Sequence, residues 1–159
     1  MLPAKPFYLI RHAESQANAA KIAAGGDHDT PLTDRGKGQA ETLSPYMSTI
    51  DPAPIRLYHS PMTRVIQTAE RISSELDLEF KEFEDLREHR LGDWNGLSWT
   101  EVLPKLESRE TPPNGETEET FVKRVRAAFT TILEDCKDGT PLIVAHGGVF
   151  HALGFMYEY

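Results

Sequence analysis

Phe7-Tyr8-Leu9-Ile10-Arg11-His12-Ala13-Glu14-Ser15 is the stretch of sequence that decides the fold. Its first four residues form an aromatic and aliphatic run, which is typical of a short buried β-strand. Ligands bind outside the carboxyl ends of the strands in open α/β sheets. Arginine offers a planar fork of donors to phosphate oxygens, and histidine can act as base, acid or nucleophile. Taken alone, Arg11 and His12 could also simply cap a strand at the surface.

Length and charge restrict the class of protein. A chain of 159 residues with 39% hydrophobic and 26% charged residues fits one ordinary globular domain, residues 1–159. The formal net charge of −8 argues against general binding to nucleic acids or membrane surfaces, which need a basic face. A small anionic substrate is still compatible with this charge, because its site needs only local positive charge.

The cysteine content and the apolar runs bear on location. Cys136 is the single cysteine, so the chain does not depend on an oxidising compartment, and its apolar surroundings indicate core rather than a reactive thiol. No apolar run approaches the length of a membrane span, and the N-terminus lacks the apolar region of a signal peptide. The sequence therefore predicts a soluble, cytoplasmic protein.

Strands and helices alternate along the chain, which predicts a three-layer α/β/α sandwich with a mostly parallel central sheet. Pro141–Ala145 is continuously apolar, as expected of a strand that is covered on both faces. Thr33 is expected to cap a helix over 34–48 that Pro45 ends or kinks, and Ser60-Pro61 is expected to open the next helix. The other predicted elements are strands at 7–10, 55–58 and 78–83, and helices near 15–24, 98–106, 117–138 and 148–157.

A second histidine follows the last predicted strand. His146 precedes Gly147 and Gly148, which allow close backbone approach and expose amides. Because the first and last strands both deliver a histidine to one edge of a parallel sheet, His12 and His146 are expected to share a site. The alternative for His146 is a histidine satisfied by hydrogen bonds at a strand end.

Arg64 adds a further cation near the start of the predicted helix after Ser60-Pro61. It lies off the apolar stripe, so it is expected to face away from the core, near a helix N-terminus that favours anions. A solvated surface arginine is the alternative. Two arginines, two histidines and a helix N-terminus together predict a pocket for a phosphoryl group. The sequence contains no zinc-type Cys–His cluster, no GxxxxGK[ST] motif and no calcium loop.

Six groups of residues occur in order along the chain. They are Arg11-His12-Ala13-Glu14-Ser15 with Asn18, Pro31–Gly36 with Gln39-Ala40, Ser60–Ala69, Leu86-Arg87-Glu88 with Gly92–Gly96, Gly115-Glu116-Thr117, and Ala145–Gly148. This ordered set resembles the histidine phosphatase superfamily, in its phosphoglycerate mutase-like branch. The resemblance covers the chain from Phe7 to about Leu153.

The resemblance implies a role for each candidate site residue. His12 would be the nucleophile that accepts the phosphoryl group as a phosphohistidine. Arg11, Arg64 and His146 would bind the equatorial phosphoryl oxygens. Glu88, rather than the neighbouring Glu84 or Asp85, would protonate the leaving oxygen and then activate water. Further phosphate contacts are expected from Asn18, Gly25 and Gly147. No metal or cofactor is expected, because the arginines take the electrostatic role of a metal.

The chain departs from the family pattern at two places. Ala13 stands where the family most often has glycine, which leaves the local backbone open to question but not the nucleophile. Relatives commonly continue past the second histidine through a helix and a further edge strand, whereas this sequence ends at Tyr159. The usual C-terminal edge strand is therefore expected to be missing, because the domain is either naturally trimmed or truncated.

The choice of reaction depends on how the substrate is covered. Residues 85–116 are expected to form a substrate-covering insertion, and with no larger cover water can reach the phosphohistidine. This favours a metal-independent phosphomonoesterase acting on a small phosphorylated metabolite. The alternatives are a phosphoglycerate mutase-type phosphotransferase, whose members are usually longer, and a catalytically inactive module that binds phosphorylated ligands. The substrate and the oligomeric state are left open; Lys105, Arg109 and Arg90 could contact a second anionic group or simply carry surface charge.

Overall fold

A sheet of four parallel strands forms the centre of the computed structural model, which describes residues 2–157. The strand order is β1-β4-β2-β3. The strands are β1 (Tyr8–Arg11), β2 (Pro54–His59), β3 (Glu79–Glu82) and β4 (Thr140–Ala145). All six residues of β4 are buried, as its continuously apolar sequence predicts for a strand covered on both faces.

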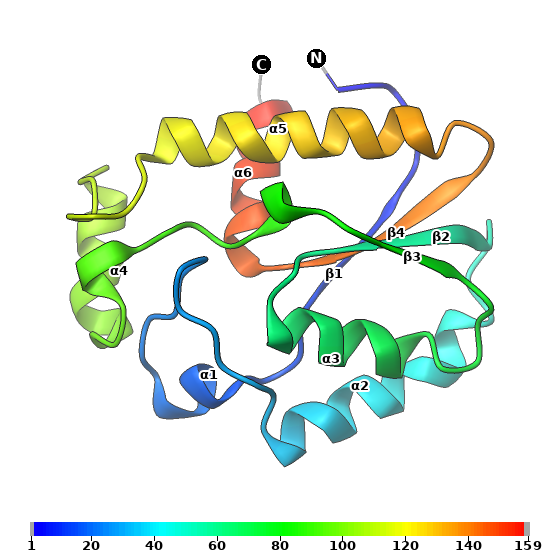
Figure 1. Ribbon diagram of the computed structural model, residues 1–159, viewed down its shortest axis with the longest axis horizontal. Coiled ribbons are helices and arrows are strands. Elements are labelled where there is room, and N and C mark those ends of the chain that lie inside the picture. Colours follow the sequence, from blue (N-terminus) through cyan, green and yellow to red (C-terminus); the bar gives the residue numbers. More distant parts are fainter. Residues whose placement is uncertain (1, 158–159) are drawn as a thin grey trace.

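Helices cover both faces of the sheet, so the predicted three-layer α/β/α sandwich is confirmed (Figure 1). The helices on one face are α2 (Asp34–Met47) and α3 (Thr63–Ile72), and those on the other are α5 (Glu118–Asp135) and α6 (Gly147–Tyr157). Apolar stripes of α3 and α5 pack on the sheet in two separate clusters. Cys136 is buried beside α5, as predicted for a core cysteine.

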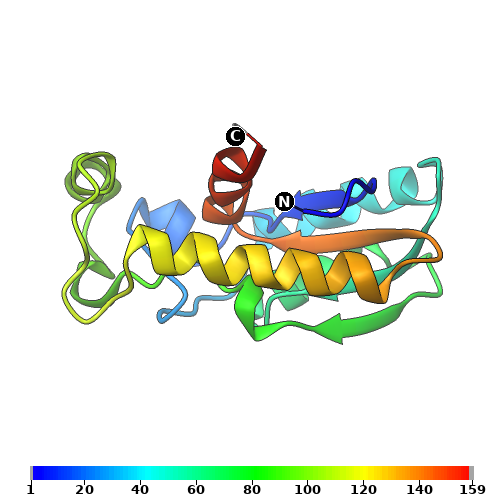
Figure 2. The ribbon, with the colours of Figure 1, turned by 90° about the horizontal axis from the view of Figure 1, so that it is seen from above.

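Smaller elements gather beyond the carboxyl ends of the strands. They are α1 (Gln16–Ala20), η1 (Glu84–Leu86), η2 (Gly92–Trp94) and α4 (Trp99–Glu107). A capping box between Ser98 and Glu101 starts α4. Figure 2 shows α4 set apart from the sheet layers, beyond the first turn of α5. Residues of α4 and of the start of α6 line a common cavity.

Pro45 does not end α2, since the helix continues to Met47, and a kink at this proline stays a prediction. Pro45 has no N–H to donate to the carbonyl of Glu41 one turn earlier. Both residues lie on the exposed side of the helix, so that carbonyl can reach water. A proline near the end of a helix therefore interrupts one hydrogen bond without ending the helix.

The predicted start of α3 at Ser60-Pro61 is wrong. The helix begins at Thr63, and Met62 precedes it without a side-chain cap. The carboxylate of Asp29 accepts a hydrogen bond from the Thr63 N–H at 2.9 Å, so the cap comes from a distant loop. The Ser60 hydroxyl accepts a hydrogen bond from the Met62 N–H at 3.4 Å and also contacts His146.

The predicted helix at 15–24 is shorter than expected. It ends where Lys21 adopts a left-handed conformation with φ 58°. The next residues instead pair with the chain before α4: Ile22 forms an antiparallel bridge with Ser98, and the Ala23 N–H donates to the Leu97 carbonyl at 2.8 Å. This contact ties the α1 region to α4.

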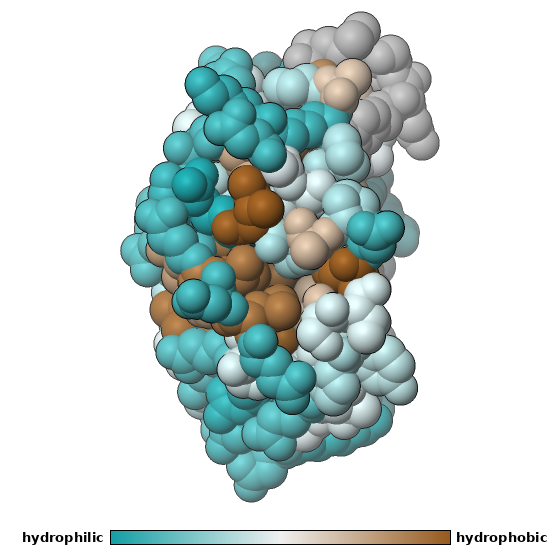
Figure 3. Space-filling model, turned by 90° about the vertical axis from the view of Figure 1, so that its right-hand side faces the viewer, coloured by the Kyte–Doolittle hydropathy of each residue, from teal (hydrophilic) through white to brown (hydrophobic). Residues whose placement is uncertain are grey.

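The amino ends of the strands lie at the opposite end of the molecule from α4. Figure 3 shows that face, where hydrophobic side chains gather among hydrophilic ones. Ile55, in β2, is 47% exposed and packs against Gly139. No helix within residues 2–157 is both long and apolar enough to cross a membrane. The cytoplasmic location inferred from the sequence stays a prediction.

The buried strand β4 should carry much of the stability. We expect Leu142→Ala to lower the free energy of unfolding by about 2–5 kcal/mol, because it leaves a cavity beneath the α2–α3 layer. Leu142 is fully buried, whereas Tyr46 on α2 is 64% exposed. Urea unfolding measures the effect, with Tyr46→Ala as the matched surface control. Equal losses in both variants would contradict the assignment of β4 to the core.

Candidate active site

Two histidines meet at the carboxyl edge of the sheet. His12 follows β1 and His146 follows β4, and their rings lie edge to face with centroids 5.3 Å apart. The side chains are almost entirely buried, with His12 8% exposed and His146 not exposed at all. The structure thus brings together the two histidines that the sequence placed at one sheet edge.

A hydrogen bond fixes the tautomer of His12. Its Nδ1 lies 2.7 Å from the Ala13 carbonyl oxygen, which can only accept, so Nδ1 carries the proton and Nε2 keeps its lone pair. Burial lowers the pKa of His12 to about 4, and the charges of Arg64 and Arg11 add to this effect. His12 is therefore a neutral imidazole at neutral pH with Nε2 available.

His146 is anchored from β2. Its Nε2 lies 2.9 Å from the hydroxyl oxygen of Ser60, which is the contact that Ser60 makes in place of a helix cap. Its Nδ1 is buried and has no hydrogen-bond partner within residues 2–157. Burial, followed by the charge of Arg64, holds the pKa of His146 well below its ordinary value. A neutral ring with one unpartnered nitrogen thus lies beside His12.

Arg64 is buried beneath a loop rather than directed to solvent. Its side chain is 2% exposed. The guanidinium donates to the carbonyls of His28 at 3.2 Å, Ala24 at 3.2 Å and Gly25 at 3.4 Å. Asp29 lies 3.5 Å from it. The burial of Arg64 contradicts the alternative of a solvated surface arginine, and its terminal nitrogens face the loop 24–29.

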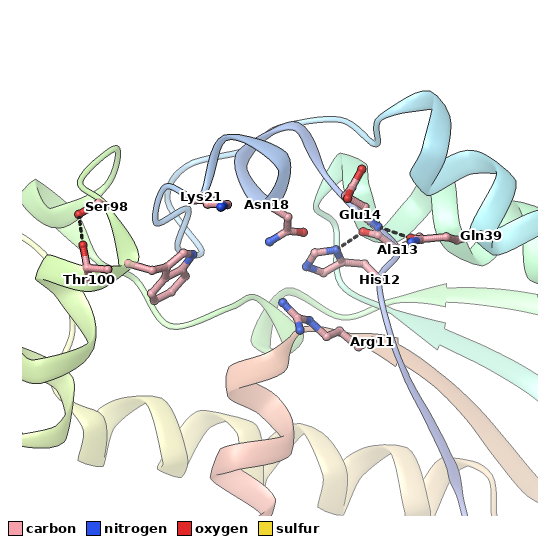
Figure 4. A pocket seen from close by; sticks show the side chains of 10 residues that line it. Arg11, His12, Ala13, Glu14, Asn18, Lys21, Gln39, Ser98 and Thr100 are labelled. Carbon is pink, nitrogen blue, oxygen red and sulfur yellow. Dashed lines mark hydrogen bonds between the residues drawn. The ribbon is translucent and has the colours of Figure 1, made fainter.

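Arg11 and Asn18 extend into a cavity beside His12 (Figure 4). Arg11 forms no ion pair within residues 2–157, so its charge is available to a ligand. The Asn18 Oδ1 accepts hydrogen bonds from the N–H and hydroxyl of Ser15, both at 3.0 Å, which leaves its amide nitrogen for the cavity. Gly147 lies against this guanidinium, since a Cβ on it would be 3.4 Å from the Arg11 Nε.

The sequence predicts that Gly25 contacts the phosphate, but in the structure its N–H has another partner. Its N–H donates to the Asn95 Oδ1 at 2.7 Å, so this donor is already used in the present conformation. A Cβ on Gly25 would lie 2.4 Å from the His89 carbonyl oxygen. The glycine is needed for close packing of the loop against the segment that carries Glu88.

The side chain of Glu88, from the segment after η1, contacts the start of α6. Its Oε2 accepts a hydrogen bond from the Gly148 N–H at 3.0 Å, and its Oε1 accepts one from the His89 N–H at 2.9 Å. A Cβ on Gly148 would lie 2.1 Å from the Oε1, so only glycine lets the carboxylate approach the helix N-terminus.

Arg124 and Glu116, to which the sequence analysis gave no role, hold the backbone of the Glu88 segment. The Arg124 guanidinium donates to the carbonyls of Asp85, Arg87 and Glu88 at 2.9, 2.8 and 2.7 Å. It also forms a largely buried ion pair with Glu116. Glu116 belongs to the quoted Gly-Glu-Thr motif, but nothing in the sequence distinguishes Arg124 from the other charged residues of α5.

Two cavities adjoin the site. The first, of about 700 Å³, is lined by Arg11, His12 and Asn18. The second, of about 620 Å³, is lined by Glu88 and by the first residues of α6. Arg11 and Trp99 line both cavities. Arg11 therefore lines both the cavity that contains His12 and the cavity that contains Glu88.

The family model of the histidine phosphatase superfamily (branch 1) matches residues 7–155. The chain belongs to this superfamily. It is 31% identical to the adenosylcobalamin/alpha-ribazole phosphatase of Salmonella typhimurium, over 92% of this chain and 76% of that protein. It is 30% identical to phosphoglycerate mutase-like protein 4 of Arabidopsis thaliana, over 91% of this chain and 67% of that protein.

A solved structure confirms the fold. Bacillus stearothermophilus YhfR superimposes with a TM-score of 0.85 at 27% identity, over 96% of this chain and 79% of that chain. The phosphoglycerate mutase-like fold that the sequence motifs imply is therefore confirmed. The names of the relatives differ in substrate, so membership of the superfamily leaves the substrate of this chain open.

The buried, neutral state of His12 has a measurable consequence. We expect its imidazole to titrate near pH 4 instead of near its ordinary 6.5, and to carry its proton on Nδ1 at neutral pH. Because the unfolded chain binds this proton more tightly, His12 should destabilise the native state as the pH falls from about 6.5 towards about 4. Nitrogen NMR measures the midpoint and the tautomer, and His12→Gln assigns the signal. A midpoint above pH 6 or an Nε2-protonated ring would contradict this environment.

Proposed function

We propose that this histidine phosphatase hydrolyses a small phosphorylated metabolite through a phosphohistidine formed on His12. The observation that carries the proposal is the Nδ1 hydrogen bond to Ala13, which leaves the Nε2 lone pair free in the cavity that Arg11 also lines. The membership of the superfamily and the phosphatases among its relatives support the same reaction.

In the first step, the Nε2 of His12 attacks phosphorus. The N–P bond forms as the bond to the leaving oxygen breaks, and that oxygen takes the electron pair and a proton from Glu88. The phosphoryl oxygens accept hydrogen bonds from Arg11, from the amide nitrogen of Asn18 and from Nδ1 of His146, which has no other partner within residues 2–157. His146 therefore carries its proton on Nδ1, and its Nε2 accepts a hydrogen bond from the Ser60 hydroxyl.

Arg64 acts in this step mainly through its charge. Its terminal nitrogens already donate to carbonyls of the loop 24–29, so a direct contact with the phosphoryl group requires it to release one of them. Gly147 and the start of α6 add the favourable field of a helix N-terminus. The positive groups of the protein thus supply the charge stabilisation for which other phosphatases use a metal, and we expect activity in the presence of EDTA.

In the second step, water attacks the phosphohistidine. The carboxylate of Glu88 takes a proton from the water as the new P–O bond forms and the N–P bond breaks, which returns His12 to its neutral state. Both cavities are lined in part by exposed residues, such as Thr100 and Leu103, so water can enter. This access favours hydrolysis over transfer to a second substrate.

Removal of the nucleophile tests the reaction. We expect His12→Ala to lower phosphate release from phosphomonoesters at least about 10³-fold, because no other side chain replaces Nε2. A colorimetric phosphate assay measures release, and an alkaline quench of the wild type should trap the acid-labile phosphohistidine. Tyr46→Ala, at an exposed position on α2, serves as the control.

Two outcomes of this experiment would overturn the proposal. If the wild type converts 3-phosphoglycerate to its 2-isomer much faster than it releases phosphate, the protein is a phosphotransferase. If no phosphomonoester is turned over in a His12-dependent manner, the protein is a module that binds phosphorylated ligands.

The proton donated by Glu88 should matter most for poor leaving groups. We expect Glu88→Gln to lower kcat/KM, which reports the steps up to formation of the phosphohistidine, about 10²–10⁴-fold for an alkyl phosphate, and much less for p-nitrophenyl phosphate, whose phenolate leaves without a proton. The matched controls are Glu84→Gln and Asp85→Asn, which remove exposed carboxylates on the same segment. Equal losses on the two substrates, or an equal loss in a control, would assign the acid elsewhere.

A further inference from the structure

The second cavity has a composition unlike that of the first. It lies between α4, the first turns of α5 and the start of α6, and has a volume of about 620 Å³, within the usual range for small-molecule sites. Its wall is largely apolar. The apolar side chains that line it include Trp99, Leu103, Leu106, Phe121, Val122 and Phe155.

The geometry of phosphoryl transfer connects this cavity to the reaction. Nucleophile and leaving oxygen lie on opposite sides of phosphorus in an in-line displacement. His12 lines the first cavity, Glu88 lines the second, and Arg11 lines both. If Arg11 holds the phosphoryl group and His12 attacks it from the first cavity, the leaving oxygen would extend into the second cavity, which Glu88 lines.

The charges around the second cavity disfavour a second anion. The cavity is lined by three carboxylates on α4, after α4 and on α5, those of Glu107, Glu110 and Glu118. The cation that lines the cavity near them is Arg109. Arg109 lies 3.5 Å from the carboxylate of Glu118, so its charge is largely compensated. His151 lies 3.9 Å from the same carboxylate. A leaving group that carries a carboxylate or a second phosphate would meet net negative charge here.

The other two cations that the sequence suggested for a second anion are also engaged. Lys105 lies over the ring of Trp94, with its Nζ 5.7 Å from the ring centroid. Arg90 lies 3.6 Å from the carboxylate of Glu84. Neither residue lines the second cavity. The alternative of ordinary surface charge is therefore the better interpretation of both.

We propose that the second cavity is the leaving-group pocket, and that it selects phosphomonoesters whose leaving group is uncharged and contains an aromatic ring. This inference rests on the proposed function, because it places the leaving oxygen at Glu88. Trp99, Leu103 and Phe155 offer contact area to such a ring, and the carboxylates exclude acidic leaving groups. Aryl, benzyl and nucleoside-type phosphates share this chemistry.

Binding of unreactive phosphonates tests the pocket without requiring turnover. Methylphosphonate, benzylphosphonate and 2-carboxyethylphosphonate share one anionic head group and differ in the attached group. Calorimetry on the wild type should show benzylphosphonate binding about tenfold or more tightly than methylphosphonate, because the ring is removed from water. The carboxyethyl compound should bind no more tightly than methylphosphonate.

Two variants assign the preference to this cavity. Leu103→Ser, at a 49% exposed position, should reduce the advantage of benzylphosphonate about threefold and leave methylphosphonate unchanged, with Tyr46→Ser as the matched control. Glu107→Lys should raise the affinity for the carboxyethyl compound, whereas Glu75→Lys, which makes the same change of net charge at an exposed position after α3, should not.

The outcomes separate this inference from the proposed function. Benzylphosphonate binding no more tightly than methylphosphonate overturns the inference, even if His12-dependent hydrolysis is found. Tightest binding of the carboxyethyl compound also overturns it, and places the leaving group in the first cavity beside Lys21. A dimer that Leu103→Ser dissociates would assign the apolar wall to a second copy. The expected binding without any turnover would support the pocket and reject the hydrolase.

Discussion

The parallel pairing of β1 with β4 is the constraint on which the site depends. Arg11 lies opposite Ala145, and the His12 N–H donates to the Ala145 carbonyl at 3.0 Å. His12 and His146 therefore follow their strands at the same position along the carboxyl edge of the sheet. Successive side chains of a strand point to opposite faces, so a shift of one residue would turn Arg11 away from Gly147 and the cavities. The complete burial of β4 opposes such a shift, because every residue is matched to an apolar layer.

The parts of the fold that the sequence predicted are those set by local pattern. The apolar run of β4, the Thr33 cap of α2 and the stripe of α5 each act within one segment, and each was found as expected. The errors arise where the partner is distant. Asp29 caps α3 from a separate loop, and no pattern near Thr63 marks that contact. The end of α1 is likewise decided by pairing with the chain before α4.

The same distinction applies to the site. Strand ends and ordered motifs were enough to predict that His12 and His146 lie together, since parallel strands share one edge. The supporting contacts could not be predicted. Arg124 donates hydrogen bonds to backbone carbonyls around Glu88. Every residue has a backbone carbonyl, so the residue types at these positions do not reveal the contact. The use of the Gly25 amide by Asn95 depends on a packing distance that only coordinates provide.

The loop 24–29 shows how an acidic chain keeps a positive site. Arg64 is buried, and a buried guanidinium needs hydrogen-bond acceptors. A close carboxylate would satisfy it but cancel its charge. The loop instead offers mainly carbonyl oxygens, and the carboxylate that reaches Arg64, that of Asp29, lies at 3.5 Å and is 39% exposed. Because carbonyls are dipoles without net charge, Arg64 still lowers the pKa of His12, whereas Asp29 raises it only as the smallest of the named causes. The acceptors chosen for Arg64 thus preserve its charge, which adds to the larger effect of burial in lowering the pKa of His12.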